Sequence, residues 1–343
     1  MTSIGRRILG WDVGGANIKA ARIGDEGRPG PAVVERPFAL WREPHRLPVV
    51  LSEVADRIGN ARTMALTMTA ELADCFATKR EGVAFVLDAF SAAFPEVEPW
   101  VYGVDGRFRS AEAARQRPLE VASANWMASA TLVARTFPDA IFLDAGSTTT
   151  DVIPIVDGQV AVRGRTDPAR LRSGELVYTG ALRTPVCAIV RWVPLGGHRC
   201  RVSAEHFAVA ADVHLWLGRI EEREYTCETP DGRGRSRLEA GARLARMVCA
   251  DLEMLRPCDI TAIAEHVAHA QVRQIAMGIR QVKRRLGRIC PRVAVLAGQG
   301  AFLTRVAAEE VGLATWDMAE DVGSAAARAA PATAVAYLLA MMT

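Results

Sequence analysis

Two stretches of the chain share one order of hydrophobic and polar positions. Residues 8–23, ILGWDVGGANIKAARI, place an apolar run before an aspartate, two glycines, a short polar tip, a lysine and a second apolar run. Residues 140–155, AIFLDAGSTTTDVIPI, repeat this order, with Asp151 at the position of Lys19. In each stretch the first aspartate stands seven residues before the second charged residue. The pattern predicts two glycine-turn hairpins in matched register, and therefore an internal duplication.

The rest of the chain alternates strand-like and helix-like patterns. Period and turn signals predict strands in 63–72 and 100–108, helices in 81–94 and 120–137, short strands in 156–203, and mostly helix in 204–286 around a polar loop at 226–237. Near the end, 291–312 predicts a buried strand, a Gly-Gln-Gly turn and a helix. Residues 322–342 predict a small-residue turn followed by an Ala-rich helix, in which Pro331 marks either the first turn or a kink.

Composition narrows the class of protein. The chain has 343 residues, half of them hydrophobic, which is enough for two α/β domains with real cores. Its net charge is only +3 and its arginines are dispersed, so we expect no nucleic-acid partner. Seven cysteines without a C-x-x-C pair suit a reducing cytoplasm rather than a disulfide framework or zinc site. Apolar runs stay short of the ~20 residues of a membrane span, so we also expect no membrane partner.

The glycine turns predict phosphate binding. Glycine lets backbone N–H groups approach an anion closely, because no Cβ stands in the way. The candidate phosphate-binding residues are Gly14, Gly15, Asn17 and Lys19 in the first hairpin, Gly146, Ser147, Thr148 and Thr149 in the second, and Gly298 and Gly300 in the third turn. A dinucleotide fingerprint is disfavoured, because the first two turns lead into strands and the third lacks its last glycine.

Charged residues beside these turns complete a phosphate site. Lys19 supplies a point charge for phosphoryl oxygens. Asp12, Asp144 and Asp151 are suited to Mg²⁺, which keeps several waters and takes few carboxylate ligands. Two facing hairpins of this kind would clamp a polyphosphate and its metal in a cleft.

The order of these motifs resembles that of the actin-like ATPase superfamily, which includes sugar kinases, acetate kinase and heat-shock ATPase chaperones. The resemblance covers the whole chain and implies a two-lobed α/β fold of the ribonuclease H-like type with a central cleft. Lobe I would comprise 1–138, with the helix at 322–343 packed back on it, and lobe II would comprise 139–321. The second hairpin, DAGSTTTDV, is most similar to the hydantoinase/oxoprolinase branch, although that branch has two glycines where Gly146-Ser147 stand here.

A narrower resemblance lies in 67–83, 124–130, 173–186 and 229–253, which look like the methanofuran-biosynthesis synthases linked to tetrahydromethanopterin-dependent one-carbon transfer. It implies a transferase reaction. The phenol oxygen of γ-glutamyltyramine, or of a tyrosine-derived analogue, displaces diphosphate from an aminomethyl-furanmethyl diphosphate and forms an ether without ATP. The glycine turns, Lys19 and Mg²⁺ would then stabilise the leaving diphosphate.

This reaction needs a base for the phenol proton. Glu71, Asp74 and Glu175 are the candidates, and the sequence leaves the choice open, since Glu71 also suits a helix first turn and Glu175 a loop. With Lys19 they form the predicted catalytic set. The basic loop at 229–237 is a candidate lid, with an ordinary surface loop as the alternative.

Two other functions stay open at this stage. One is an ATP-dependent small-molecule kinase or hydantoinase-like hydrolase, for which Asp74 or Asp105 could serve as base and a nucleotide would be bound. The other is an ATP-binding switch or filament protein, which the short chain disfavours. In the favoured reading the partners are small-molecule substrates, and a homodimer is the assembly we consider.

Overall fold

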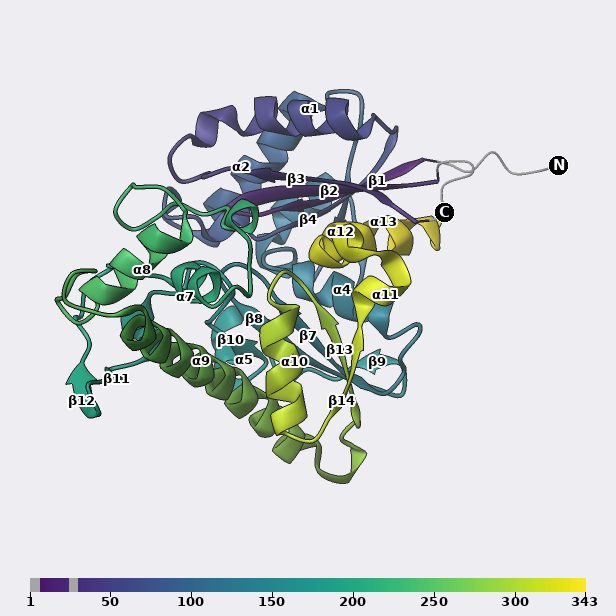
Figure 1. The fold of residues 1–343 in the computed structure, drawn as a ribbon. Coiled ribbons are helices and arrows are strands. Elements are labelled where there is room, and N and C mark those ends of the chain that lie inside the picture. Colours follow the sequence, from purple (N-terminus) through teal and green to yellow (C-terminus); the bar gives the residue numbers. More distant parts are fainter. Residues whose placement is uncertain (1–6, 25–29) are drawn as a thin grey trace. The chain divides into compact units, whose positions relative to one another are not determined.

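The structure is a computed structural model that describes residues 7–24 and 30–343. The chain forms two compact units, and Figure 1 labels the helices and strands from which they are built. Unit 1 is Met1–Phe142, Ile153–Ala169 and Trp316–Thr343, and unit 2 is Leu143–Val152 and Arg170–Thr315. The units differ in their bounds from the lobes drawn from the sequence, because residues 139–142, 153–169 and 316–321 group with the first unit and not the second.

Unit 1 is built on a six-stranded sheet of order β3-β2-β1-β4-β5-β6. Its strands are β1 (Ile8–Val13), β2 (Asn17–Ile23), β3 (Ala32–Pro37), β4 (Thr63–Met68), β5 (Trp100–Tyr102) and β6 (Phe108–Arg109). Strands β1 and β2 pair antiparallel with Asp12 opposite Lys19, and β4 runs parallel to β1 with Thr67 opposite Asp12. The first predicted hairpin is therefore confirmed, and Lys19, Asp12 and Thr67 lie in one row across the sheet.

Helices contact this sheet along both faces. The helices of unit 1 are α1 (Leu47–Ile58), α2 (Lys79–Ala93), α3 (Ala111–Gln116), α4 (Asn125–Val133), α11 (Met318–Val322), α12 (Ser324–Arg328) and α13 (Ala330–Ala340). Three short 3-10 helices accompany them, namely η1 (Pro44–Arg46), η2 (Ala70–Leu72) and η3 (Pro118–Glu120). Trp11 packs edge-on against Phe90 of α2 at 5.9 Å between ring centroids. The neighbouring Gly10 lies on the opposite face of β1, because successive residues of a strand point to opposite faces. It meets the backbone of α13 so closely that a Cβ would collide with the Ala332 carbonyl. Gly10 thus lets α13 lie directly on β1.

The sheet of the second half has order β10-β8-β7-β13-β14, with β9 beside β8. Its strands are β7 (Ala140–Ala145), β8 (Thr150–Val156), β9 (Gln159–Val160), β10 (Leu176–Val177), β13 (Val293–Ala297) and β14 (Ala314–Asp317), and β11 (Trp192–Leu195) and β12 (His198–Arg201) form a separate ribbon. Strands β7 and β8 are neighbours in this sheet, which confirms the second hairpin.

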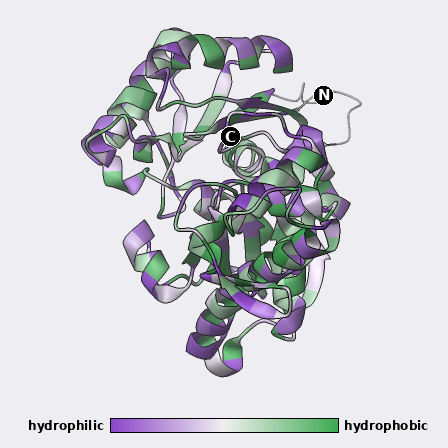
Figure 2. Ribbon diagram, turned by 60° about the vertical axis from the view of Figure 1, so that its left-hand side comes forward, coloured by the Kyte–Doolittle hydropathy of each residue, from purple (hydrophilic) through white to green (hydrophobic). Residues whose placement is uncertain are grey.

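The helices of this half are α5 (Asp167–Ser173), α6 (Val186–Ile189), α7 (Ala210–Trp216), α8 (Arg237–Arg246), α9 (Pro257–Leu286) and α10 (Ala301–Glu310), with η4 (Glu222–Glu224) and η5 (Gly287–Ile289). Residues of α6 to α9 form one apolar core. Hydrophobic and hydrophilic residues alternate along many helices in Figure 2, as expected for helices that bury one face.

Two predicted elements differ from the observed ones. The helix expected over 120–137 is the shorter α4, which ends at Val133 and starts only at Asn125, because Ser123 adopts a left-handed conformation (φ 51°) that a right-handed helix cannot contain. Helix α5 was not predicted, since only short strands were expected there. The strand, turn and helix of 291–312 and the position of Pro331 in the first turn of α13 are confirmed.

In the part of the chain that the structure describes, no helix has both the length and the apolar character to cross a membrane.

Candidate active site

The tip of the first hairpin presents backbone amides. The Gly14 amide closes the turn by donating to the Asn17 carbonyl at 3.0 Å. The carbonyls of Gly15 and Ala16 accept bonds from Leu40 and Phe38, both at 3.0 Å. Within residues 7–24 and 30–343, the amides of Gly15 and Ala16 themselves donate to no protein acceptor. The loop that follows β3 therefore occupies the carbonyl side of the tip and leaves its donors for another acceptor.

The second hairpin repeats this arrangement at its own tip. The Gly146 amide donates to the Thr149 carbonyl at 2.9 Å. The carbonyls of Gly146 and Ser147 accept amides from residues 181–183 at 2.9 to 3.1 Å. Among the described residues, the amides of Ser147 and Thr148 meet no acceptor. Both tips are thus nests of N–H groups of the kind that bind phosphate.

The segment under the second tip is held by a buried polar network. The Gln271 amide of α9 donates to the Gly180 carbonyl at 2.7 Å and to the Thr179 hydroxyl at 2.9 Å. Its oxygen contacts His214 Nε2 at 2.9 Å. Burial lowers the pKa of His214 from 6.5 to about 4, so the imidazole is neutral at pH 7. A Cβ on Gly180 would come within 2.5 Å of the Thr148 nitrogen, so this glycine is needed for the close approach.

The third glycine turn packs against the second hairpin. Gly298 has a positive φ of 82°, and a Cβ on it would collide with the Ala145 carbonyl and an Asp144 carboxylate oxygen. The Gly300 amide donates to the Ala145 carbonyl at 2.9 Å and precedes α10. Asp144 and the Gly-Gln-Gly turn are therefore neighbours in unit 2.

Lys19 and Asp151 hold equivalent positions but meet different partners. The Lys19 ammonium donates to the Arg328 carbonyl at 2.7 Å and lies 3.8 Å from the Glu35 carboxylate. Asp151 is 8% exposed and accepts a bond from the Arg170 guanidinium at 2.7 Å. An ammonium has three donors, so Lys19 keeps capacity for a phosphate oxygen. The charge of Asp151 is balanced inside the protein, which favours a structural role over that of a metal ligand.

The chemistry of Asp12 and Asp144 fits Mg²⁺, which needs only one or two carboxylates when phosphate and water supply the other ligands. In the described ranges no group of three His, Cys, Asp or Glu side chains is placed to hold a metal by itself. A metal at either aspartate would therefore depend on oxygens of a bound phosphate.

Glu71 lies in a buried cluster within unit 1. It is 1% exposed, and its Oε1 accepts a hydrogen bond from the Ser123 hydroxyl at 2.7 Å. The Lys79 ammonium lies 3.7 Å from the same oxygen and 2.5 Å from Asp167. Burial raises the pKa of Glu71, while Ser123 and Lys79 oppose the rise. In the described part of the chain the buried Oε2 has no hydrogen-bond partner.

The cluster adjoins the tip of the first hairpin. The Thr69 amide donates to the Val13 carbonyl at 2.9 Å, which ties the start of η2 to the end of β1. A Cβ on Gly15 would lie 3.8 Å from the Ala73 side chain. A carboxylate with a raised pKa and a nest of amides are thus placed together in one unit.

The other two candidate bases lie in different surroundings. Asp74 is exposed, like the neighbouring Cys75. The Glu175 carboxylate is fully buried in unit 2 and forms an ion pair with Arg285. Glu71 therefore differs from Glu175 in its partner, since a serine hydroxyl and not a guanidinium makes the close contact with its Oε1, and it differs from Asp74 in being buried.

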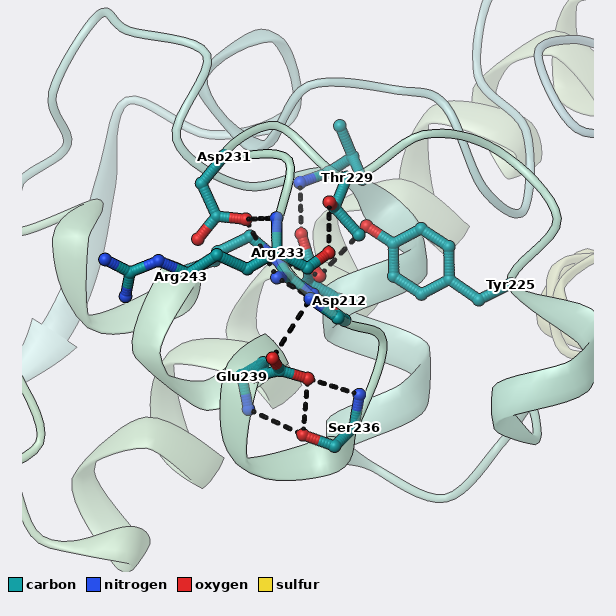
Figure 3. Close-up of polar contacts among 10 residues, drawn as sticks. Asp212, Tyr225, Thr229, Asp231, Arg233, Ser236, Glu239 and Arg243 are labelled. Carbon is teal, nitrogen blue, oxygen red and sulfur yellow. Dashed lines mark hydrogen bonds and ion pairs between the residues drawn. The ribbon is translucent and has the colours of Figure 1, made fainter.

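The basic loop considered as a lid is tied to a buried group (Figure 3). Arg243 of α8 is fully buried and donates to Asp212 at 2.8 Å, to Asp231 at 3.1 Å and to the Gly234 carbonyl at 3.1 Å. Tyr225 donates to Asp212 at 3.1 Å. These bonds fix both sides of the loop to α7 and α8, which favours an ordered loop over a lid.

Sequence reasoning missed Ser123, Asp167 and Gln271. The left-handed Ser123 and the Asp167 of α5 come from segments predicted as helix and as short strands. Gln271 lies on the buried face of the 30-residue α9. A polar residue among the apolar positions of a helix was the one signal that could have identified Gln271.

Comparison with known proteins gives a consistent result. The model of the hydantoinase/oxoprolinase family matches residues 62–341. A Methanocaldococcus jannaschii protein named (4-{4-[2-(gamma-L-glutamylamino)ethyl]phenoxymethyl}furan-2-yl)methanamine synthase is 36% identical over 334 residues, 97% of each chain. A Methanococcus vannielii protein of the same name is 35% identical over 149 residues, 43% of this chain and 67% of its own.

Solved structures extend the comparison to the fold. The nucleotide-free structure of acetone carboxylase matches with a TM-score of 0.59 at 12% identity, covering 94% of this chain and 69% of that one. A chain of a PilM–PilN type IV pilus biogenesis complex matches with a TM-score of 0.50 at 14% identity, covering 98% of both. At these identities the likeness concerns the fold alone, and it confirms the predicted actin-like ATPase fold.

Proposed function

We propose that this chain, which belongs to the hydantoinase/oxoprolinase family, forms the aryl ether of methanofuran biosynthesis. It is 36% identical to one furan-methanamine synthase over 97% of both chains. It is an enzyme that acts on small molecules. The near-complete coverage carries this proposal, because no large segment with a different task is added or lost between the two proteins.

The proposed reaction joins a phenol to a furanylmethyl carbon. The bond between that carbon and the diphosphate oxygen breaks, and its electron pair leaves with diphosphate. The furan ring shares the positive charge left on the carbon, and the phenol oxygen of γ-glutamyltyramine donates the pair that forms the ether. The phenol proton passes to a base of the protein. Carbon, phosphate and proton are then all accounted for without ATP.

The first hairpin supports the departure of diphosphate. We assign the amides of Gly15 and Ala16 to phosphate oxygens, because both are N–H donors without an acceptor in the described chain. Lys19 adds a positive charge from the strand after the turn. Asp12 is the proposed metal ligand here, and Mg²⁺ bound to diphosphate would neutralise charge on the leaving group.

The second hairpin offers an equivalent nest in unit 2. Its Ser147 and Thr148 amides are assigned to phosphate oxygens, with Asp144 as the metal ligand next to the Gly-Gln-Gly turn. Asp151 is assigned a structural role, because Arg170 balances its charge.

Glu71 is the proposed base. A buried carboxylate with a raised pKa is a stronger base than an exposed one, and its partnerless Oε2 can accept a phenol proton. The same burial keeps water away from the base, and water is the competitor that would turn the furanylmethyl cation into an alcohol. Glu71→Gln removes the base with little change in shape, and we expect a loss of about 10² to 10⁴-fold in kcat.

The proposal is tested by incubating the purified protein with Mg²⁺, the furan diphosphate and γ-glutamyltyramine, without ATP. Mass spectrometry should detect the coupled ether, and inorganic diphosphate should appear in equal amount. A product or ADP that forms only after ATP is added would support instead the kinase or hydrolase function of the same fold.

Assembly and location are further parts of the proposal. A homodimer would give twice the mass of the 37.0 kDa chain in light scattering. The seven cysteines, all within the described residues, are free thiols, which supports a reducing cytoplasm and is testable by cell fractionation.

A further inference from the structure

Three side chains around Glu71 come from distant parts of the sequence. Lys79 is the first residue of α2, Ser123 lies just before α4, and Asp167 is the first residue of α5. We propose that Ser123 and Lys79 are positioning residues that orient the Glu71 carboxylate and keep it ionised for ether formation, with Asp167 fixing Lys79. This inference rests on the proposed function, in which Glu71 is the base.

The donor chain has one direction. The Lys79 ammonium has only protons to give, and it donates to the Ser123 oxygen at 3.0 Å. Ser123 then has a single proton to donate. Its distance to Glu71 is 2.7 Å and that to Asp167 is 3.2 Å, so the shorter bond goes to Glu71. The order Lys79 to Ser123 to Glu71 therefore fixes one edge of the carboxylate.

This order decides which oxygen reacts. Oε1 of Glu71 is occupied by the Ser123 hydroxyl, whereas Oε2 is buried and lacks a partner within the described residues. A phenol proton is therefore transferred to Oε2. The O–H bond of the phenol breaks and an O–H bond forms at Oε2 while the phenol oxygen bonds to carbon.

The charges of the cluster keep this oxygen basic. Two carboxylates, Glu71 and Asp167, share one ammonium, so the cluster has a net negative charge when Glu71 is ionised. Burial raises the pKa of Glu71, the Ser123 bond and the Lys79 charge lower it, and the Asp167 charge raises it. Loss of either Ser123 or Lys79 removes an interaction that favours the ionised form. Glu71 would then be protonated at a higher pH and unable to accept the phenol proton.

The backbone offers a clean variant for this test. Ser123 has a φ of 51°, a conformation that glycine adopts without the steric cost that a Cβ brings. Ser123→Gly therefore deletes the hydroxyl without adding backbone strain, whereas Ser123→Ala would keep the strain. Ser129→Ala is the control, because it removes the same hydroxyl from a buried serine of the neighbouring helix α4 whose hydroxyl bonds only the Asn125 carbonyl of its own helix.

The experiment measures the protonation of Glu71 directly in the full-length protein without substrate. Glutamate is labelled with ¹³C at the carboxyl carbon, the Glu71 signal is identified by its loss in Glu71→Gln, and its shift is followed against pH. We expect Ser123→Gly and Lys79→Met each to raise the midpoint by about one pH unit, and Ser129→Ala to leave it in place.

The pH dependence of kcat is the second measurement. In both variants the acidic limb of the kcat profile should move up by the same amount, so that activity lost at pH 7 is partly recovered at higher pH. An unchanged Glu71 midpoint with kcat reduced equally at every pH would overturn the inference. If the wild-type protein made no ether at all, the proposed function would fail, and the labelled-carboxyl titration would still decide the positioning roles.

Discussion

The two hairpins close with the same backbone bond and differ in the charge of the strand that follows. Gly14 donates to the Asn17 carbonyl in one and Gly146 to the Thr149 carbonyl in the other, at 3.0 and 2.9 Å. After the turn, the first hairpin carries a partly exposed lysine, whereas the second carries a buried aspartate bound to an arginine. The shared backbone indicates a shared task of presenting amides.

The difference shows which charges are available to a ligand. A buried ion pair at 2.7 Å is balanced within the fold, while Lys19, 3.8 Å from its carboxylate partner, keeps donors for a phosphate. The two hairpins are therefore more alike in sequence than in the charges that they can offer to a ligand. In the proposed function, the first hairpin is therefore the one that brings a side-chain cation to the substrate, and the second is assigned its amides and Asp144.

The largest effects are expected at the first aspartate of each hairpin. Asp12→Asn and Asp144→Asn should each lower kcat by about 10³-fold, because each weakens the proposed metal at the leaving group. Circular dichroism should show an intact fold, and the Mg²⁺ concentration for half-maximal rate should rise. An active Asp12→Asn enzyme with unchanged Mg²⁺ dependence would remove the metal assignment.

The next largest effect is a difference in stability between variants of two ion pairs, Arg170 with Asp151 and Lys19 with Glu35. Arg170→Met removes the buried guanidinium that lies 2.7 Å from Asp151 and should cost about 3 to 5 kcal/mol of unfolding free energy. Lys19→Met should cost about 1 kcal/mol or less, since its ion pair is long and partly exposed, and should affect turnover instead. Urea denaturation of both variants makes this comparison, and equal losses of stability would contradict it.

A smaller effect follows from His214 beneath the second hairpin. Burial lowers the pKa of this histidine from 6.5 to about 4. At a pH between these two values the imidazole is therefore protonated in the unfolded chain and neutral in the folded protein. Stability from this group is thus complete above pH 6.5 and is lost as pH falls toward 4, by about 3 kcal/mol in total. His214→Asn should flatten this part of the curve of unfolding free energy against pH, whereas a curve of unchanged slope would show that His214 titrates normally.

The smallest expected effect is a difference in stability between alanine variants of two glycines near the hairpin tips, Gly180 and Gly15. A methyl on Gly180 would come within 2.5 Å of the Thr148 nitrogen, and we expect Gly180→Ala to cost about 1 to 3 kcal/mol of stability. A methyl on Gly15 would lie at an ordinary 3.8 Å from Ala73, so Gly15→Ala should be close to neutral in stability. Thermal unfolding of the two variants should rank them in this order, and the reverse order would show that the first tip is the more tightly packed.

The hairpins could be predicted from the sequence because their signals are local. Apolar runs, an aspartate and glycines within sixteen residues specify strand, turn and strand, and the family resemblance supplied the order of the motifs. The strand and helix around the Gly-Gln-Gly turn were predictable for the same reason.

The surroundings of the base were not predictable, because they depend on contacts between distant residues. Ser123 lies 52 positions from Glu71, and Asp167 lies 88 positions from Lys79. No periodicity marks such pairs, and the left-handed Ser123 even interrupts the helix that the pattern predicted. The ion pair of Asp151 with Arg170 was missed for a related reason, since α5, which carries the arginine, was not predicted.

The central claim is that the phenol oxygen attacks carbon and that diphosphate leaves. The most direct test uses γ-glutamyltyramine with ¹⁸O at the phenol, together with the furan diphosphate and Mg²⁺ and without ATP. Attack at carbon predicts an ether that retains the label and inorganic diphosphate that carries none. Label recovered in an aryl phosphate, with the furan released as an alcohol, would place the attack at phosphorus and contradict the claim.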